Sequence, residues 1–288
     1  MCTRERPHHL ERTLDSLGRQ TTTDFPVVVV DQSPVVNYRL QQRADVDDRL
    51  TVLRQEGHGA SRARNLAWRR VTTEWVVFLD DDCRPDPDWA EAISAALVAC
   101  PNAGFVSGEI TGAEVSTTEH LPVTTCHVGE ERARSGRWTL PWDIGFTASC
   151  AIRRSTLQRL GGLDDRLGAG APDFPSAEDM DFNYRFLKAG GVAFVTPRIR
   201  VHHEQWRAGE ELASHFRGYA QGWSGFAMKH LRGGDVIGGL WLWSLGVLDL
   251  ARMLTSALRR RSLFRLRVAA SKLQGLVKGT AKGLVYPW

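Results

Sequence analysis

Three consecutive aspartates, Asp80, Asp81 and Asp82, directly follow the apolar run Trp75–Leu79. That run is typical of a strand buried on both faces, and ligands of open α/β sheets bind at the carboxyl ends of such strands. Adjacent carboxylates repel one another, and a divalent cation relieves the repulsion and can bridge the oxygens of a diphosphate. A solvated acidic turn is the alternative, which the preceding buried strand makes less favoured. If the extended backbone continues, Asp80 and Asp82 point to one side and Asp81 to the other.

Further acids lie at the ends of predicted elements. Asp31 follows a run of four valines, a second segment typical of a buried parallel strand. Glu178 and Asp179 lie near the start of a helix predicted over residues 176–189. A carboxylate at a helix N-terminus is stabilised as the anion, which is the form that a general base needs. Ser176 three residues before Asp179 also fits a capping box, so a purely structural role for Asp179 stays open.

Other patterns are weaker. The sequence G-H-G at residues 57–59 precedes a predicted helix, but Arg62 stands where a dinucleotide-binding fingerprint needs a third glycine. No P-loop sequence occurs, so nicotinamide and P-loop sites are disfavoured. Arg64 on the same helix can reach a phosphate or a base, whereas Arg62 is more typical of a solvated face. His202 and His203 follow a predicted strand and, without context, are more typical of ordinary polar residues than of metal ligands.

Alternating strands and helices must position these residues. Helices are predicted at 7–20, 60–70, 88–99 and 176–189, and strands at 27–30, 51–53, 75–79, 192–195 and 199–201. Such units predict an α/β fold with a mostly parallel, doubly wound sheet. Only two residues precede Thr3, so we expect a shortened first strand. The later pattern is helical, which predicts an α/β domain over 1–209 and a helical extension over 210–288.

The composition limits the class of protein. In 288 residues, 42% are apolar and 24% charged, which excludes disorder, collagen and coiled coil for the whole chain. The five cysteines form no C-x-x-C pair, which argues against a disulfide scaffold and a structural zinc site and fits a reducing cytoplasm. The first residues contain no apolar run of signal-peptide length. The longest nearly apolar stretch, Val236–Leu248, has 13 residues, fewer than the roughly 20 of a spanning helix.

The net charge of +4 is unevenly distributed. Nine of the 37 Lys and Arg residues, and none of the 33 acids, lie after Ala251. This basic end predicts an anionic partner, either lipid or nucleic acid. The segments 240–258 and 263–285 combine apolar residues with tryptophans or bases, which favours the membrane headgroup region over nucleic acid. We therefore predict a cytoplasmic protein held peripherally on the inner face of the cell membrane. Packing of these helices on the rest of the chain or on a second copy is the alternative.

An ordered set of segments from Thr3 to about Glu204 resembles glycosyltransferase family 2, the inverting enzymes with a nucleotide-sugar-binding α/β domain. The segments that carry the resemblance are TRERPHHL, VVVVDQSP, GASRARN, FLDDDCRPDPDW, TASCAIRRSTLQ, SAEDMDFNYRF and VHHEQW. FLDDDC resembles the D-x-D signature of the family, and SAEDMD resembles its E-D element. The resemblance implies an α/β fold of the nucleotide-sugar transferase type.

The resemblance also implies roles for individual residues. Asp179 corresponds to the catalytic base, and Glu178 orients the acceptor or the helix start. The residues implied in nucleotide-sugar binding are Thr3, Asp31, Arg64, Asp80 and Asp81, with Asp81 near the ribose. The residues implied in metal binding are Asp82, Asp80 and His203, with Asp82 the principal ligand and His203 a better match than His202.

The implied reaction moves a sugar from a nucleoside-diphosphate sugar to an acceptor hydroxyl with inversion, assisted by Mg²⁺ or Mn²⁺. A glycan or lipid-linked acceptor in cell-surface polysaccharide or glycolipid synthesis fits the predicted location, and self-association stays open. One alternative is a decayed transferase body that binds membrane or nucleic acid. Another is a nucleotidyltransferase, although the chain lacks the Gly-rich, Arg/Lys-bearing N-terminal loop expected of that class.

Overall fold

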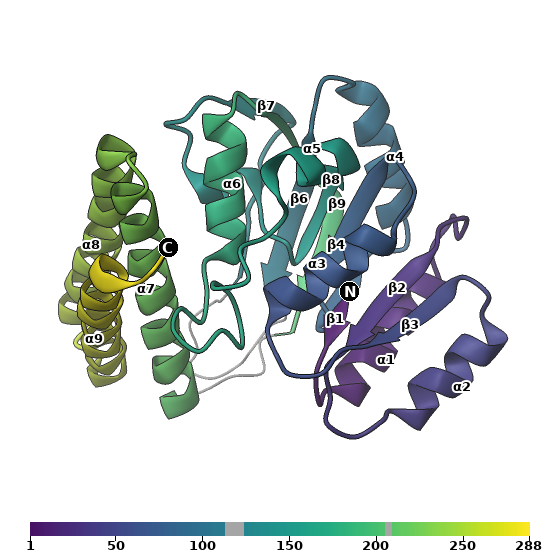
Figure 1. The fold of residues 1–288 in the computed structure, drawn as a ribbon, viewed down its shortest axis with the longest axis horizontal. Coiled ribbons are helices and arrows are strands. Elements are labelled where there is room, and N and C mark those ends of the chain that lie inside the picture. The colour runs from purple at the N-terminus through teal and green to yellow at the C-terminus, as the bar shows by residue number, and fades with distance from the viewer. Residues whose placement is uncertain (113–123, 205–208) are drawn as a thin grey trace. The chain divides into compact units, whose positions relative to one another are not determined.

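A computed structural model describes residues 1–112, 124–204 and 209–288, and the chain divides into two compact units (Figure 1). Among the described residues, the first unit holds 1–112, 124–163 and 179–204, and the second holds 164–178 and 209–288. The predicted boundary at residue 209 remains a prediction. The segment 164–178 groups with the C-terminal helices although it lies far from them in the sequence.

The first unit begins with a three-stranded parallel sheet in the order β1-β2-β3. Its strands are β1 (Cys2–Thr3), β2 (Val27–Asp31) and β3 (Leu50–Arg54), and its helices are α1 (Pro7–Gly18) and α2 (Tyr38–Val46). The apolar face of α1 buries Leu10, Leu14 and Leu17 in the core. The expected shortening of the first strand is observed, since β1 consists of two residues paired with β2.

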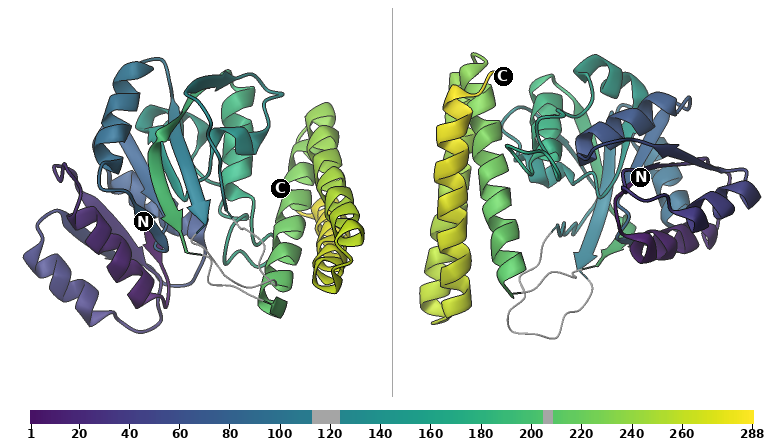
Figure 2. Two further views of the ribbon diagram at one scale, coloured as in Figure 1. Left: turned by 180° about the vertical axis from the view of Figure 1, so that it is seen from behind. Right: turned by 60° about the horizontal axis from the view of Figure 1, so that its bottom comes forward.

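The rest of the first unit surrounds a six-stranded sheet in the order β4-β8-β6-β9-β5, with β7 paired to β9. The strands are β4 (Trp75–Leu79), β5 (Cys83–Pro85), β6 (Phe105–Gly112), β7 (Arg132–Ser135), β8 (Ser149–Arg153) and β9 (Val192–His203). The helices are α3 (Ala60–Arg70), α4 (Trp89–Ala99), the 3₁₀ helix η1 (Pro141–Ile144), α5 (Arg154–Leu160) and α6 (Glu178–Lys188). Figure 2 shows α4 and α6 on opposite sides of this sheet.

Burial of both sheet faces explains the continuous apolar runs of the strands. Neighbouring residues of one strand belong to different cores: Phe105 packs with Phe182 and Phe186 of α6, whereas Val106 packs with Ile93 of α4. The α/β fold class, with helices covering the sheet and a C-terminal helical extension, is confirmed. Within the six-stranded sheet only the β6–β9 pair is parallel, and the other pairs are antiparallel.

Strand β9 replaces two predicted short strands. The sequence pattern breaks at Thr196-Pro197, but the strand continues through a register shift in which Gly108 pairs with Thr196 and Glu109 pairs with Arg200. A Cβ atom on Gly108 would lie 2.1 Å from the Ile199 carbonyl oxygen, so the bulge requires a residue without a side chain there. The continuous strand reaches His203 at its end.

In the residues that the structure describes, the second unit contains three helices, α7 (Gly209–Arg232), α8 (Val236–Arg259) and α9 (Leu263–Val285). Glycines 275, 279 and 283 of α9 lie against α7 so closely that added Cβ atoms would meet it at 2.1, 2.2 and 2.7 Å. By length and composition, the 24-residue α8 could cross a membrane, and 22% of its apolar window is buried. The prediction that no segment reaches spanning length is therefore wrong for α8. The apolar stretch was taken to end at Asp249, but the helix continues to Arg259.

Candidate active site

The three aspartates occupy a turn, which we call the aspartate turn (Asp80–Asp82), between the end of β4 and the start of β5. The Cys83 N–H donates to the Asp80 carbonyl at 3.3 Å, and the Thr13 hydroxyl of α1 lies 2.9 Å from the Asp81 carbonyl oxygen. The expected alternation of the three side chains is wrong because the extended backbone has already ended at Leu79. The Asp81 and Asp82 side chains converge instead.

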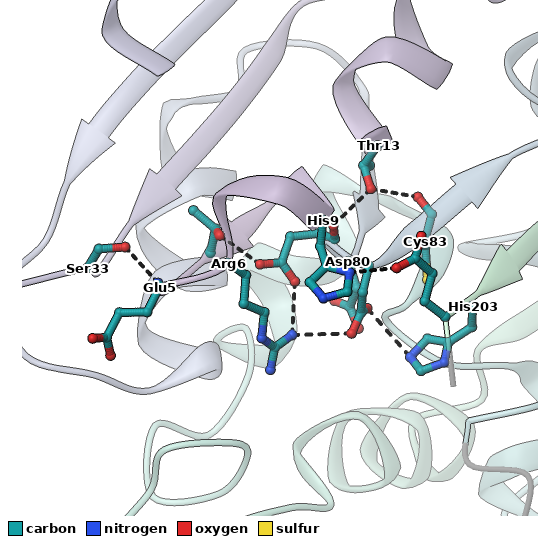
Figure 3. Close-up of polar contacts among 12 residues, drawn as sticks. Glu5, Arg6, His9, Thr13, Ser33, Asp80, Cys83 and His203 are labelled. Atoms are coloured by element: carbon teal, nitrogen blue, oxygen red, sulfur yellow. Dashed lines mark hydrogen bonds and ion pairs between the residues drawn. The ribbon is translucent and has the colours of Figure 1, made fainter. Parts of the chain in front are cut away.

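Arg6 joins these two carboxylates (Figure 3). Its Nη1 atom donates to Asp81 Oδ1 at 3.1 Å and to Asp82 Oδ2 at 3.2 Å. Both aspartates are buried, and a buried carboxylate needs a compensating cation or donor. Arg6 was not predicted from the sequence, although its position at the start of α1, just after the strand end at Thr3, was a usable signal.

Arg64 of α3 neutralises the third carboxylate. Its Nη2 atom lies 2.6 Å from Asp80 Oδ1, and the arginine itself is 6% exposed. Burial opposes ionisation of Asp80, but the charge and hydrogen bond of Arg64 outweigh it and hold the Asp80 pKa below its ordinary value. Burial raises the pKa of Asp81 to about 6; the charge of Asp82 adds to this, while Arg6 opposes it. The turn therefore places three carboxylates beside two arginines.

The parallel register of the first sheet places Thr3, Asp31 and Arg54 in one row at the carboxyl ends of β1, β2 and β3. The Thr3 hydroxyl donates to Asp81 Oδ2 at 2.7 Å, which links this row to the aspartate turn. Asp31 is 1% exposed and accepts from Arg54 Nη1 at 2.6 Å and from the Ser33 N–H at 2.8 Å. Arg54 was also missed, because only strand register brings it to Asp31. Contact of Asp31 with a base stays a prediction.

The antiparallel pairing of β5 with β9 brings His203 beside Cys83. His203 Nε2 lies 3.5 Å from Asp82 Oδ1, and both side chains are buried. His202 points elsewhere: its Nε2 atom lies 2.9 Å from Asp86 Oδ1, and half of its side chain is exposed. Of the two histidines, the structure therefore brings His203 to the aspartate turn.

The side chains near the turn fit a divalent cation. Potential ligand atoms of Asp82, Cys83 and His203 all lie within 4.8 Å of one another. Burial raises the pKa of the Cys83 thiol well above its ordinary value, so the thiol stays protonated and is a poor ligand. The remaining carboxylate and imidazole suit Mn²⁺, and the carboxylates also suit Mg²⁺. Asp80 is committed to Arg64, and its role as a ligand stays a prediction.

Glu178 and Asp179 begin α6, and the hydroxyl of Ser176 is bound to α7. The helix starts at Glu178, and the Ser176 hydroxyl lies 3.2 Å from the carbonyl oxygens of Gly218 and Tyr219. Asp179 Oδ1 accepts from the Met180 N–H at 2.8 Å. The capping-box alternative for Asp179 stays a prediction.

Cys150 of β8 provides a link between Asp179 and the aspartate turn. Burial raises the pKa of the Cys150 thiol well above its ordinary value; the charge of Arg64 opposes this, and the charges of Asp179 and Asp80 add to it. Both carboxylates therefore lie within electrostatic range of one buried residue of the sheet. The common site of Asp179 and the aspartate turn stays a prediction.

Known structures share this fold. The mannosyltransferase PcManGT from Pyrobaculum calidifontis, solved with GDP-Man and Mn²⁺, superposes with a TM-score of 0.62 at 17% identity, covering 100% of this chain and 86% of that one. This similarity establishes the α/β fold of the nucleotide-sugar transferase type.

This chain spans only part of the length of the relatives that it matches in sequence. An uncharacterized glycosyltransferase of Haemophilus influenzae is 28% identical over 61% of this chain and 56% of its own. The O-antigen biosynthesis protein RfbC of Myxococcus xanthus is 26% identical over 70% of this chain and 17% of its own. The model of the family "Glycosyl transferase family 2" matches residues 1–161, more than half of the chain, and this protein therefore belongs to glycosyltransferase family 2.

Proposed function

We propose that this protein is an inverting, metal-dependent glycosyltransferase that uses a nucleoside-diphosphate sugar. The observation that carries the proposal is the convergence of Thr3, Arg6 and His203 on the aspartate turn, at the carboxyl ends of β1 and β4. Its three adjacent carboxylates suit a divalent cation, which would supply positive charge for a diphosphate. The GDP-Man and Mn²⁺ bound by the related fold support the same ligand chemistry.

In this proposal different residues of the chain contact different parts of the nucleotide-sugar donor. Thr3 and Asp31 face the nucleotide from the ends of the parallel strands, and Asp81 receives the ribose. Asp82 and His203 hold the cation, with Asp80 and Arg64 completing the wall of the diphosphate site. When bound, the cation supplies positive charge that stabilises the diphosphate leaving group.

Asp179 is the proposed base. It accepts the proton of the acceptor hydroxyl while that oxygen bonds to the anomeric carbon from the face opposite the diphosphate. The bond between the anomeric carbon and the diphosphate oxygen breaks in the same step, so the configuration inverts. Glu178, which is 8% exposed, orients the acceptor or the start of α6.

The acceptor is proposed to be a glycan or lipid-linked sugar of cell-surface polysaccharide or glycolipid synthesis. The relative named for O-antigen biosynthesis supports this class. The surface of the second unit supports a membrane location, because α8 and α9 expose apolar side chains. The most exposed are Ile237, Leu258, Leu263, Val277 and Val285.

Exposed bases lie next to these apolar side chains. Arg259 ends α8, and Arg260 and Arg261 follow it in the turn before α9, between the exposed Leu258 and Leu263. Apolar residues beside arginines suit the headgroup layer of an anionic membrane. The proposed attachment is peripheral, on the cytoplasmic face. Release of the protein from membranes by high salt would support peripheral attachment. Retention in high salt, with extraction only by detergent, would indicate that α8 spans the bilayer.

The proposal is tested by thermal melting with a panel of nucleotide sugars, with and without Mn²⁺. We expect one nucleotide class to raise the melting temperature only when the metal is present, and mixtures with acceptor to release nucleoside diphosphate. Release of pyrophosphate would indicate a nucleotidyltransferase. Absence of both metal-dependent binding and donor hydrolysis would contradict the enzyme and favour the decayed transferase body.

A further inference from the structure

The segment Asp164–Ala177 of the second unit is a loop with a fully buried aromatic residue. Phe174 is 0% exposed, and it forms a bridge with Leu167 across the loop. The Gly168 N–H donates to the Phe174 carbonyl at 3.0 Å. Connecting segments normally run over the protein surface with exposed side chains. The burial of Phe174 therefore indicates specific packing contacts between this loop and other parts of the second unit.

Helix α7 packs against one side of this loop. Added Cβ atoms would lie 2.1 Å from Phe174 Cδ1 at Gly225 and 2.2 Å from the Ser176 hydroxyl oxygen at Gly222. These glycines are on the helix face that also carries Gly218, whose carbonyl accepts from the Ser176 hydroxyl. The loop therefore lies directly on the backbone of α7, in space that only glycine leaves open.

The residues after α9 form the other side. Trp288 stacks on Phe174 with ring centroids 4.8 Å apart, and Tyr286 meets Phe174 edge-on at 5.1 Å. The Arg166 guanidinium lies 5.2 Å from the centre of the Trp288 ring. Phe174 is thus enclosed by α7 and two aromatic side chains, each pair being a favourable stacking or edge contact.

Charge pairs fix the loop along its length. Asp164 accepts from Arg166 Nη2 at 2.7 Å, and Lys229 Nζ of α7 is also 2.7 Å from Asp164. Burial opposes ionisation of Asp164, but these partners outweigh it and lower its pKa to about 2. Further along, Asp173 pairs with Lys282 of α9. Charge pairs therefore hold the loop at its first residue and directly before its aromatic anchor.

The loop leads directly into the start of α6. Ala177 has a φ of +73°, a conformation that residues with a side chain rarely adopt, and Glu178 and Asp179 follow it. Backbone in this region persists only where its surroundings hold it. The grip on residues 173–176 therefore constrains the point at which the two acids begin their helix.

We propose that Trp288, Tyr286 and the glycine face of α7 form a clamp that positions loop 164–177, and through it Glu178 and Asp179, for the acceptor. The catalytic half of this inference rests on the proposed function, whereas the clamp itself does not. Trp288 and Phe174 are accordingly positioning residues. Nucleotide binding involves other elements, so the clamp acts on transfer and leaves donor affinity unchanged.

The test compares Trp288→Ala with the control Val285→Ala, which removes an 80% exposed side chain nearby. Hydrogen exchange of loop 164–177 in the free protein should become about tenfold faster in Trp288→Ala and stay unchanged in the control. Transfer to acceptor should fall about tenfold, while Mn²⁺-dependent binding of UDP and GDP is retained. Unchanged loop exchange overturns the clamp. Faster exchange with normal transfer per bound donor overturns the positioning role.

A second pair of variants guards against a simple folding defect. Gly225→Ala places a methyl group against Phe174 from the α7 side, whereas Gly218→Ala meets Pro175 only at 3.3 Å. The clamp predicts faster loop exchange and slower transfer in Gly225→Ala than in Gly218→Ala, with α7 itself still protected. Equal behaviour of the two variants overturns the clamp. If no nucleotide sugar supports turnover in the unmodified chain, the proposed function fails while the exchange measurements still test the clamp.

Discussion

The aspartate turn and loop 164–177 both concentrate carboxylates, but they differ in how those charges are balanced. In the turn, three adjacent acids lie beside Arg6 and Arg64, and burial raises the pKa of Asp81 to about 6 against the effect of Arg6. In the second unit, Asp164 has two cationic partners within 2.7 Å, and its pKa falls to about 2. Carboxylates with a raised pKa are typical of ligand sites, whereas closely matched ion pairs stabilise the fold.

The largest expected effect tests the catalytic side of this comparison. Asp179→Asn should lower turnover by roughly 10²–10⁴-fold, because an amide cannot accept the acceptor proton. Donor affinity and melting temperature should change little. Turnover of the purified variant and isothermal titration with the donor measure the two quantities. Glu178→Gln is the matched neighbour and should lose much less; equal losses would contradict the assignment of the base.

The second prediction concerns the exposed bases of the second unit. Replacing Arg259, Arg260 and Arg261 together by Gln should weaken binding to vesicles with anionic lipid by roughly 10²-fold, at about 1 kcal/mol per base. Sedimentation with vesicles at low and high salt measures this. The control replaces three exposed arginines of the first unit, Arg19, Arg39 and Arg70. An equal loss of vesicle binding in the control variant would indicate an effect of net charge alone and would contradict a membrane-binding surface on the second unit.

The third prediction concerns metal binding at the aspartate turn. Asp82→Ala should remove the Mn²⁺ dependence of nucleoside-diphosphate binding and weaken that binding by about 10–100-fold. Asp86→Ala is the control, since Asp86 accepts contacts from Arg200 and His202 away from the turn. Titrations with and without chelator distinguish the variants. A metal effect of normal size in Asp82→Ala would show that Asp82 is not the ligand.

The smallest effect concerns the matched charges of the loop. The pKa of Asp164 is lower in the folded chain, about 2, than its ordinary 3.8, so its ionisation stabilises the fold above about pH 4. That contribution is lost as the pH falls toward 2. Asp164→Asn should therefore lower the free energy of unfolding by about 1–2 kcal/mol at pH 7. Urea unfolding at pH 7 and pH 3 measures the difference, which should shrink at the lower pH; a constant difference would argue against the ionised pair.

Much of the frame was predictable because it depends on local pattern. Helix α3 and strand β4 have the predicted bounds, since each is a continuous run of suitable residues ended by a clear break. The aspartate turn and the start of α6 were also found, because strand and helix ends expose groups that attract ligands. Antiparallel pairing of β8 was not predictable, because apolar runs look alike in either direction.

The sequence by itself determined which residues could do chemistry and which elements carry them: acids after strands, an acid pair at a helix start, and a basic, apolar end. Tertiary structure alone decided which of them meet. Arg6 joins Asp81 to Asp82, register selects His203 over His202, and Trp288 reaches Phe174 from over a hundred residues away. Such contacts depend on strand register and helix packing between distant segments, and no local periodicity carries that information.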